Sequence, residues 1–154
     1  MTASTPSSRI EAVAQYLVLK ALAGRMSVIK AIYDYFVNNE SPSTLSRKYG
    51  LSKHQIRGYV QRIIEKSGSS IKAKVFIAYL TPYVMKIKPL CKRIRDDVVR
   101  CILCGDEMPH LVFEDHIMKY HSGVVKEYVF SVLDLVSRSL HSKQVSRTHE
   151  VETP

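Results

Sequence analysis

Residues 41–66 (SPSTLSRKYGLSKHQIRGYVQRIIEK) carry the signals of two short helices joined by a tight turn. Ser41 is suited to cap the first helix, and Pro42 lies in its first turn, where a missing N–H costs nothing. Gly50 supplies the turn with a residue that tolerates positive φ. Ser52 is suited to cap the second helix. This order of signals restricts the fold strongly, because it requires a compact helical hairpin.

Apolar residues recur at helical spacing within this hairpin and before it. Leu45 and Tyr49 lie four apart in the first helix. The second helix repeats the pattern at Ile56, Tyr59, Val60 and Ile63. Residues 27–38 form another amphipathic helix, which would complete a three-helix bundle within residues 9–70. Residues 9–23 form a helix that is apolar over most of its circumference, so it must be covered on more than one side, either by the core or by a second copy.

The run Leu45-Ser46, Gly50-Leu51-Ser52 and Ile56 resembles the helix-turn-helix of DNA-binding transcriptional regulators. In that family the second helix enters the major groove with its N-terminal residues on base edges. The resemblance therefore implies base contacts from Lys53, His54, Arg57, Gly58 and Gln61. It implies phosphate contacts from Arg47, Lys48 and Ser52. The alternative is an ordinary helical hairpin with a polar outer face.

The positive charge of the chain is concentrated around this hairpin. The net charge is +9, and residues 41–100 hold fourteen basic and three acidic side chains. Residues 101–154 hold five basic and eight acidic side chains, so the C-terminal third is acidic. A basic segment centred on a helix-turn-helix is what phosphate binding requires. Charge alone does not separate double-stranded DNA from RNA, because phosphate contacts carry no sequence information.

A second motif lies in residues 99–122. Cys101 and Cys104 are separated by two residues, and His116 and His121 by four. Zinc prefers four sulfur or nitrogen ligands at the corners of a tetrahedron. This pattern resembles a C2H2 zinc finger, although the spacer of eleven residues between Cys104 and His116 is one shorter than usual. The resemblance implies that these four side chains bind Zn²⁺.

Other residues of this segment indicate a structural role for the finger. Met108 and Phe113 are expected to form a small core under the metal, His110 to lie on the surface, and Cys91 to act as a small buried hydrophobe. The helix positions that read bases in DNA-binding fingers fall on Pro109, Val112 and Asp115. Pro and Val cannot pair with base edges, and Asp is repelled by phosphate. We therefore expect a structural clamp or a surface for a protein partner.

The remaining segments give weaker signals. Residues 71–98 form a basic connector, predicted as a helix over 71–81 bent at Pro82 and followed by a second short helix. The alternative is a strand pair that would act as the wing of a winged helix. Residues 123–142 are predicted to form a C-terminal helix that docks on the finger, on helix 9–23 or on a second subunit. Residues 1–8 and 143–154 are polar and expected to be disordered.

Composition excludes some classes of protein. No stretch of 18 apolar residues is present, which argues against a transmembrane helix and a membrane partner. The N-terminus lacks the order of a signal peptide, and a C-x-x-C in a chain with three cysteines fits a reducing compartment. These features indicate a cytoplasmic, nucleoid-associated protein. Four ligands would close the zinc site, so we do not expect an enzyme.

Together these observations predict a mainly α fold: a helix-turn-helix bundle, a single C2H2 finger and a C-terminal helix. The predicted function is sequence-specific binding of double-stranded DNA by helix 52–66, as a transcriptional regulator and homodimer. The combination resembles small regulators of archaea and their viruses. The alternatives are a zinc-dependent nuclease or recombinase fragment, and a protein-interaction or RNA-binding module.

Overall fold

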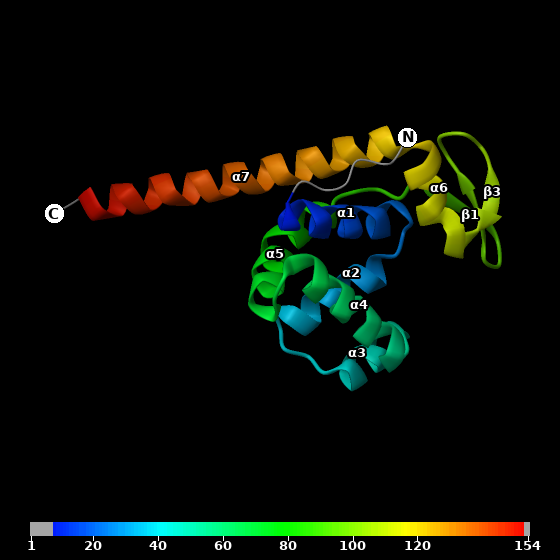
Figure 1. The fold of residues 1–154 in the computed structure, drawn as a ribbon, viewed down its shortest axis with the longest axis horizontal. Coiled ribbons are helices and arrows are strands. Elements are labelled where there is room, and N and C mark those ends of the chain that lie inside the picture. The colour runs from blue at the N-terminus through cyan, green and yellow to red at the C-terminus, as the bar shows by residue number, and fades with distance from the viewer. Residues whose placement is uncertain (1–7, 153–154) are drawn as a thin grey trace.

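The computed structural model describes residues 8–152, with side chains over residues 8–143, and shows a mainly helical chain with one small sheet (Figure 1). The helices are α1 (Arg9–Leu22), α2 (Met26–Phe36), α3 (Pro42–Tyr49), α4 (Lys53–Ser67), α5 (Ser70–Val84), α6 (Phe113–Tyr120) and α7 (Ser122–Glu152). The strands are β1 (Cys91–Arg95), β2 (Val98–Cys101) and β3 (Glu107–Pro109), and a 3-10 turn, η1 (His110–Val112), follows them. The fold class expected from the sequence is thus confirmed at the level of a mainly helical chain with a Cys/His cluster.

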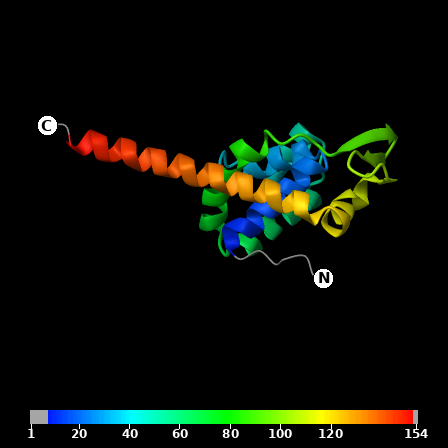
Figure 2. The same ribbon diagram turned by 90° about the horizontal axis from the view of Figure 1, so that it is seen from above.

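Helix α1 lies at the centre of the molecule. It packs against α2, α4 and α5 on one side and against α7 and α6 on the other (Figures 1 and 2). Its side chains Val13, Leu17 and Leu22 are fully buried, as the wide apolar face of this segment predicts. Buried residues from the helices and from residues 91–121, called the finger segment here after its predicted motif, form one continuous cluster. The helical body and the finger therefore share one core.

Helices α3 and α4 are joined by the three residues Gly50–Ser52, and the expected turn chemistry is present. Ser41 caps α3 by accepting from the Thr44 N–H, and Gly50 ends it at φ 70°. Ser52 accepts from the Gln55 N–H, and the Gln55 side chain accepts in return from the Ser52 N–H. This reciprocal capping box fixes the start of α4.

Helix α5 is one helix from Ser70 to Val84, so the strand-pair alternative for this segment is wrong. Ala73, Ile77, Leu80 and Val84 are buried at spacings of four, three and four, which is the period of a helix. Pro82 lies in the last turn and does not divide the helix. The second short helix expected after it is also wrong, because β1 begins at Cys91.

The sheet has the order β1-β2-β3 with both neighbouring pairs antiparallel. Cys91 pairs with Cys101, and Val99 pairs with Met108. The finger module therefore begins at Cys91, eight residues before the expected boundary at residue 99, because β1 is needed to cover β2.

Helix α7 extends past the rest of the molecule at the end opposite the finger (Figures 1 and 2). Its buried residues Val125, Val129, Val132 and Val136 face α1 and α5. The backbone stays helical to Glu152, so the disorder expected from residue 143 is not what the structure has. Of the N-terminal segment expected to be disordered, residues 1–7 lie outside the described residues, and Ser8 caps α1. Among the helices described, none has the length and apolar character needed to cross a membrane.

Candidate metal centre and nucleic-acid interface

Cys101, Cys104, His116 and His121 come together at one end of the molecule, with their ligand atoms all within 4.8 Å of one another. Cys101 ends β2, and Cys104 lies in the turn before β3. His116 is on α6, while His121 is the residue that ends this helix and has non-helical φ and ψ. The two imidazoles therefore come from α6 and from the residue at its C-terminal end.

Two sulfur–nitrogen pairs in the cluster have the separation that a tetrahedral metal site requires. The Cys101 Sγ–His121 Nε2 distance is 3.6 Å, and the Cys104 Sγ–His116 Nε2 distance is 3.4 Å. Metal–sulfur and metal–nitrogen bonds of the lengths usual for zinc give a sulfur–nitrogen separation of about 3.5 Å across a tetrahedron. Cys101 is buried and His116 is 9% exposed, so two ligands are largely withdrawn from water. The four residues can hold a metal ion.

The turn between the cysteines is held by backbone hydrogen bonds. The Cys101 N–H donates to the Asp106 carbonyl, and the Gly105 N–H donates to the Cys101 carbonyl, each at 2.8 Å. Gly105 has φ 81°, a conformation that favours glycine. The eleven-residue spacer between Cys104 and His116 is taken up by the short β3 and the 3-10 turn η1. The shortened spacer therefore still brings the two ligand pairs together.

The core beneath the cluster is larger than a finger alone would have. Phe113 and Ile117 are fully buried, and Val99 is 2% exposed. All three belong to the continuous core shared with α1. Met108, expected as the partner of Phe113, is half-buried and packs at the edge of this core. Both residues expected beneath the metal therefore contribute to this core, which is larger than the small core expected because it continues to α1.

Polar contacts fasten the finger to the C-terminal end of α1. His110 Nε2 lies 2.5 Å from the Ala23 carbonyl oxygen, and the Cys91 thiol donates to the same carbonyl at 3.5 Å. The Leu90 N–H donates to the Leu22 carbonyl at 2.8 Å. These groups satisfy carbonyls that a helix end leaves unpaired. His110 is thus a contact residue, not the free surface residue that the sequence indicated.

A buried cation joins α1, α4 and α6. Lys20 is 6% exposed, and its Nζ lies 3.0 Å from Glu114 Oε2 on α6. The same Nζ lies 5.0 Å from the centre of the Tyr16 ring and 5.4 Å from that of Tyr59 on α4. Burial lowers the pKa of Lys20, and Glu114 opposes that shift. Sequence reasoning missed this residue, because nothing in the local pattern pairs Lys20 with a residue 94 positions away.

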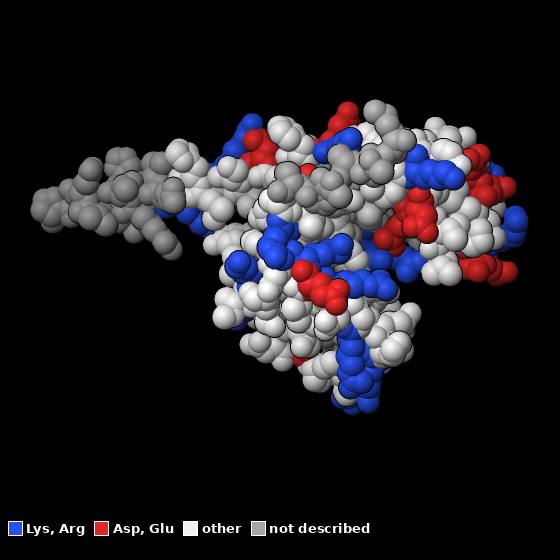
Figure 3. Space-filling view, viewed as in Figure 1, with Lys and Arg blue, Asp and Glu red and all other residues white. Residues whose placement is uncertain are grey.

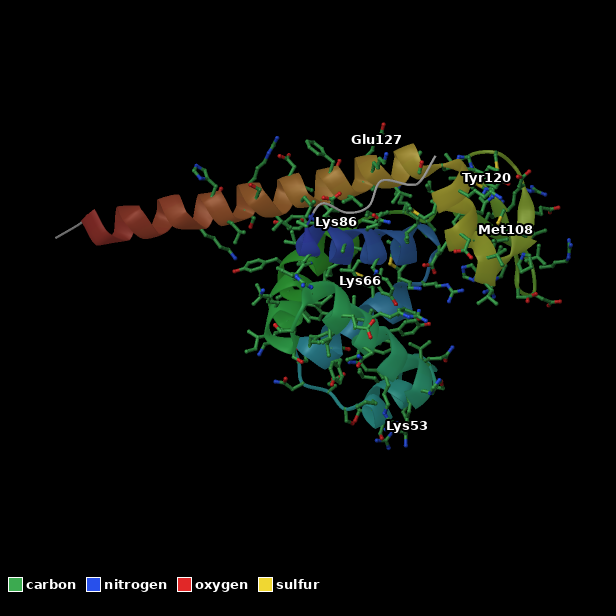
Figure 4. All side chains as sticks on the ribbon, viewed as in Figure 1. Lys53, Lys66, Lys86, Met108, Tyr120 and Glu127 are labelled. Carbon is green, nitrogen blue, oxygen red and sulfur yellow. The ribbon has the colours of Figure 1, made fainter. Side chains whose placement is uncertain are left out.

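The predicted base-contacting residues lie along α4. Lys53, His54, Arg57 and Gln61 are exposed, and Gly58 is half-buried with open space around it. Lys53 lies at the end of the body farthest from α7 (Figure 4). Gln61 donates to Glu65 Oε1 at 3.1 Å, so its amide is held by its own helix. None of these five residues is covered by another segment of the described chain.

Two of the predicted phosphate-contacting residues are engaged elsewhere. Lys48 Nζ lies 3.0 Å from Asp34 Oδ2 and 3.4 Å from Glu40 Oε1, and the hydrogen bond to Asp34 raises the pKa of Lys48. Ser52 uses its hydroxyl oxygen as the cap of α4. Arg47 is exposed. Lys48 therefore ties α3 to α2, and its side chain remains 46% exposed.

Basic side chains continue along α4 beyond the predicted set. Figure 3 shows Lys and Arg atoms along α4, interrupted by one acidic patch, and several acidic side chains on the finger. The added residues are Arg62, which is exposed, and Lys66, which is labelled near α1 in Figure 4 and lies 5.7 Å from the Tyr16 ring centre. Burial raises the pKa of Tyr16 to about 12, and Arg62 opposes that shift. In the sequence, the basic residues Arg62 and Lys66 have the same spacing of four as Lys53 and Arg57, and this spacing could have indicated them.

The chain was compared with protein-family models, with curated proteins and with solved structures, and none of the three comparisons gave a match.

Proposed function

We propose that the protein binds double-stranded DNA in a sequence-specific manner and acts as a transcriptional regulator, with α4 as the helix that enters the major groove. The observation that carries this proposal is the start of α4: a capped helix whose outer side presents Lys53, His54 and Arg57 to solvent. Arg and Lys pair with the guanine acceptors O6 and N7, and an α-helix fits the major groove. The helix-turn-helix resemblance and the basic middle third of the chain support the same assignment.

The proposed cofactor is Zn²⁺ in a structural role. Two thiolates and two imidazoles are a preferred zinc donor set, and four protein ligands leave no open position for a substrate or water. The cluster also stands on the shared core beside α1, where a bound ion would fix the finger against the helical body. The nuclease or recombinase alternative needs an open metal position, which this donor set does not offer.

Selection from random duplex DNA over a series of salt concentrations tests the proposal. Phosphate contacts weaken steeply as salt rises, whereas base contacts retain a sequence preference. We expect one preferred motif to persist as the overall affinity falls. Enrichment without any preferred sequence would contradict specific binding, and stronger retention of single-stranded RNA would favour the RNA alternative.

Arg57→Ala is expected to weaken binding to the selected site by about 1–3 kcal/mol and to relax preference at one base position. Lys119→Ala is the matched control: it also removes one exposed positive charge, but it lies on α6 of the finger. Fluorescence anisotropy with the selected site and with single-base variants measures both effects. Equal losses for the two variants, with unchanged base preference, would mean that Arg57 contributes only charge.

A further inference from the structure

We propose that the protein forms a two-fold symmetric dimer through one flank of α7, with Phe130 of each copy inserted into a groove on the other. The partner at this surface is a second copy of the chain. The role of this dimer in recognising paired half-sites rests on the proposed DNA binding, whereas the dimer itself is argued from α7 and its neighbours.

The groove lies where α7 passes over α1 and α6, and it has a volume of about 340 Å³. Its apolar lining comes from Met118 on α6 and from Val125, Val129 and Leu133 on α7. Glu11 and Gln15 on α1 form the opposite wall. A concave apolar surface of this size, bordered by polar side chains, is suited to receive a large apolar side chain.

Phe130 lies at the edge of this groove and is 74% exposed. Leu133 and Leu140 continue the same flank of α7 at spacings of three and seven residues, and Leu140 is 37% exposed. An exposed aromatic side chain beside an apolar groove marks an interaction surface, and aromatic residues commonly anchor such surfaces. The Phe130 side chain and the groove lie on the same face of the molecule. A two-fold axis between two copies therefore places the Phe130 of each copy in the groove of the other.

Charges on α7 determine the direction of this pairing. Lys126 and Asp134 lie four residues before and four residues after Phe130, so they flank it on the same side of the helix. In an antiparallel pair of α7 helices that cross at Phe130, Lys126 of each copy faces Asp134 of the other. A parallel pair would place Lys126 against Lys126 and Asp134 against Asp134. Asp134 also pairs with Arg138 on its own helix at 3.0 Å, and its side chain is 41% exposed, so it remains accessible to a partner.

Sedimentation equilibrium of the full, zinc-loaded chain without DNA tests this dimer. We expect the wild type to be a dimer and Phe130→Asp to raise the dissociation constant at least roughly tenfold, as loss of a central aromatic anchor does. Leu111→Asp is the matched control, because Leu111 is 79% exposed on η1 of the finger. This variant should dimerise like the wild type. Circular dichroism should show unchanged helix content for both variants.

A charge exchange tests the antiparallel direction. Lys126→Glu should weaken the dimer, and Lys126→Glu combined with Asp134→Lys should restore it. A double variant as weak as Lys126→Glu would overturn the antiparallel arrangement. A wild type that stays monomeric would overturn the dimer, and a Phe130→Asp protein that dimerises normally would overturn the interface at Phe130. Neither result bears on the DNA selection, so failure of the two proposals can be told apart.

Discussion

Asp34 on α2 is a buried carboxylate on which side chains from α3 and from the residues after α2 converge. It accepts hydrogen bonds from Asn38 at 2.8 Å, from Lys48 at 3.0 Å and from the Tyr49 hydroxyl. Burial alone would raise the pKa of Asp34, but the hydrogen bonds from Tyr49, Lys48 and Asn38 outweigh it and lower the pKa below its usual value of 3.8. This carboxylate therefore fixes the position of α3 on the helical body.

Asp34→Asn is expected to lower the free energy of unfolding at pH 7 by about 1–3 kcal/mol, because the charged acceptor for Lys48 is lost. The folded state holds Asp34 ionised more strongly than the unfolded state does. Its contribution is thus present above pH 3.8 and is lost as the pH falls through the lower, folded-state pKa. Urea unfolding of wild type and variant should give free energies of unfolding that converge as the pH falls below the folded-state pKa of Asp34. The exposed Asp97→Asn serves as control, and a pH-independent difference would contradict the ionised role of Asp34.

Individual residues were predictable from the sequence where their partners are near or their spacing is diagnostic. The four clustered ligands follow from two short spacings, and the caps Ser41 and Ser52 follow from their places before helical runs. The ion pair of Lys48 with Asp34 could not be predicted, because Asp34 lies fourteen positions away on another helix. Pairings of this kind depend on the packing of whole helices, which local patterns do not specify.

At the scale of elements, the helices with one clear apolar face were predicted closely, and the segment after them was not. In α5 nearly every second residue is apolar or β-branched. The spacing of its apolar residues therefore fits the two-residue period of a strand as well as the 3.6-residue period of a helix over part of its length. Tertiary packing against α2, α4 and α7 decides for the helix. The strand β1 was missed because its five residues, CKRIR, do not alternate between apolar and polar types, and its two less exposed positions are three apart.

Helix α4 offers a test of the balance between stability and binding at Gly58. This glycine lies within the helix and has no atom within 4 Å of an added Cβ. Gly58→Ala is therefore expected to stabilise the protein by roughly 0.5–1 kcal/mol, because glycine is a poor helix former. If the DNA backbone or a base edge approaches α4 closely at this point, the added methyl group should weaken binding to the selected site.

Gly50→Ala is the matched control for Gly58→Ala. It also meets no neighbouring atom, but Gly50 has φ 70°, which is unfavourable for alanine. This variant should be less stable by about 1 kcal/mol. Thermal unfolding and anisotropy measure stability and binding separately. Unchanged DNA affinity in the more stable Gly58→Ala protein would remove Gly58 from the contact surface.

For the whole molecule, the decisive feature is that the finger and the helices share one core. Phe113 and Ile117 are buried in the same cluster as Leu17 and Ile63. Lys20 adds a polar link from Glu114 to the Tyr59 ring on α4. The sequence indicated separate modules in series, since their motifs are separated along the chain. Their fusion depends on contacts between α1 and residues about 90 positions later, which no local pattern reveals.

Removal of the proposed zinc ion should therefore destabilise the whole molecule and not the finger segment alone. Zinc binding contributes on the order of 10 kcal/mol to the folding of isolated finger peptides. We expect a chelator, or Cys104→Ser, to lower the melting temperature of the entire helical signal in a single transition. The same change should weaken DNA binding, because α4 would be held less rigidly on the core.

Cys91→Ser is the control, because Cys91 lies outside the ligand cluster and serine can still donate to the Ala23 carbonyl. Circular dichroism and Co²⁺ absorption follow folding and metal binding together. Two separate transitions, with the helical body unaffected by chelation, would show that the shared core does not couple the finger to α4.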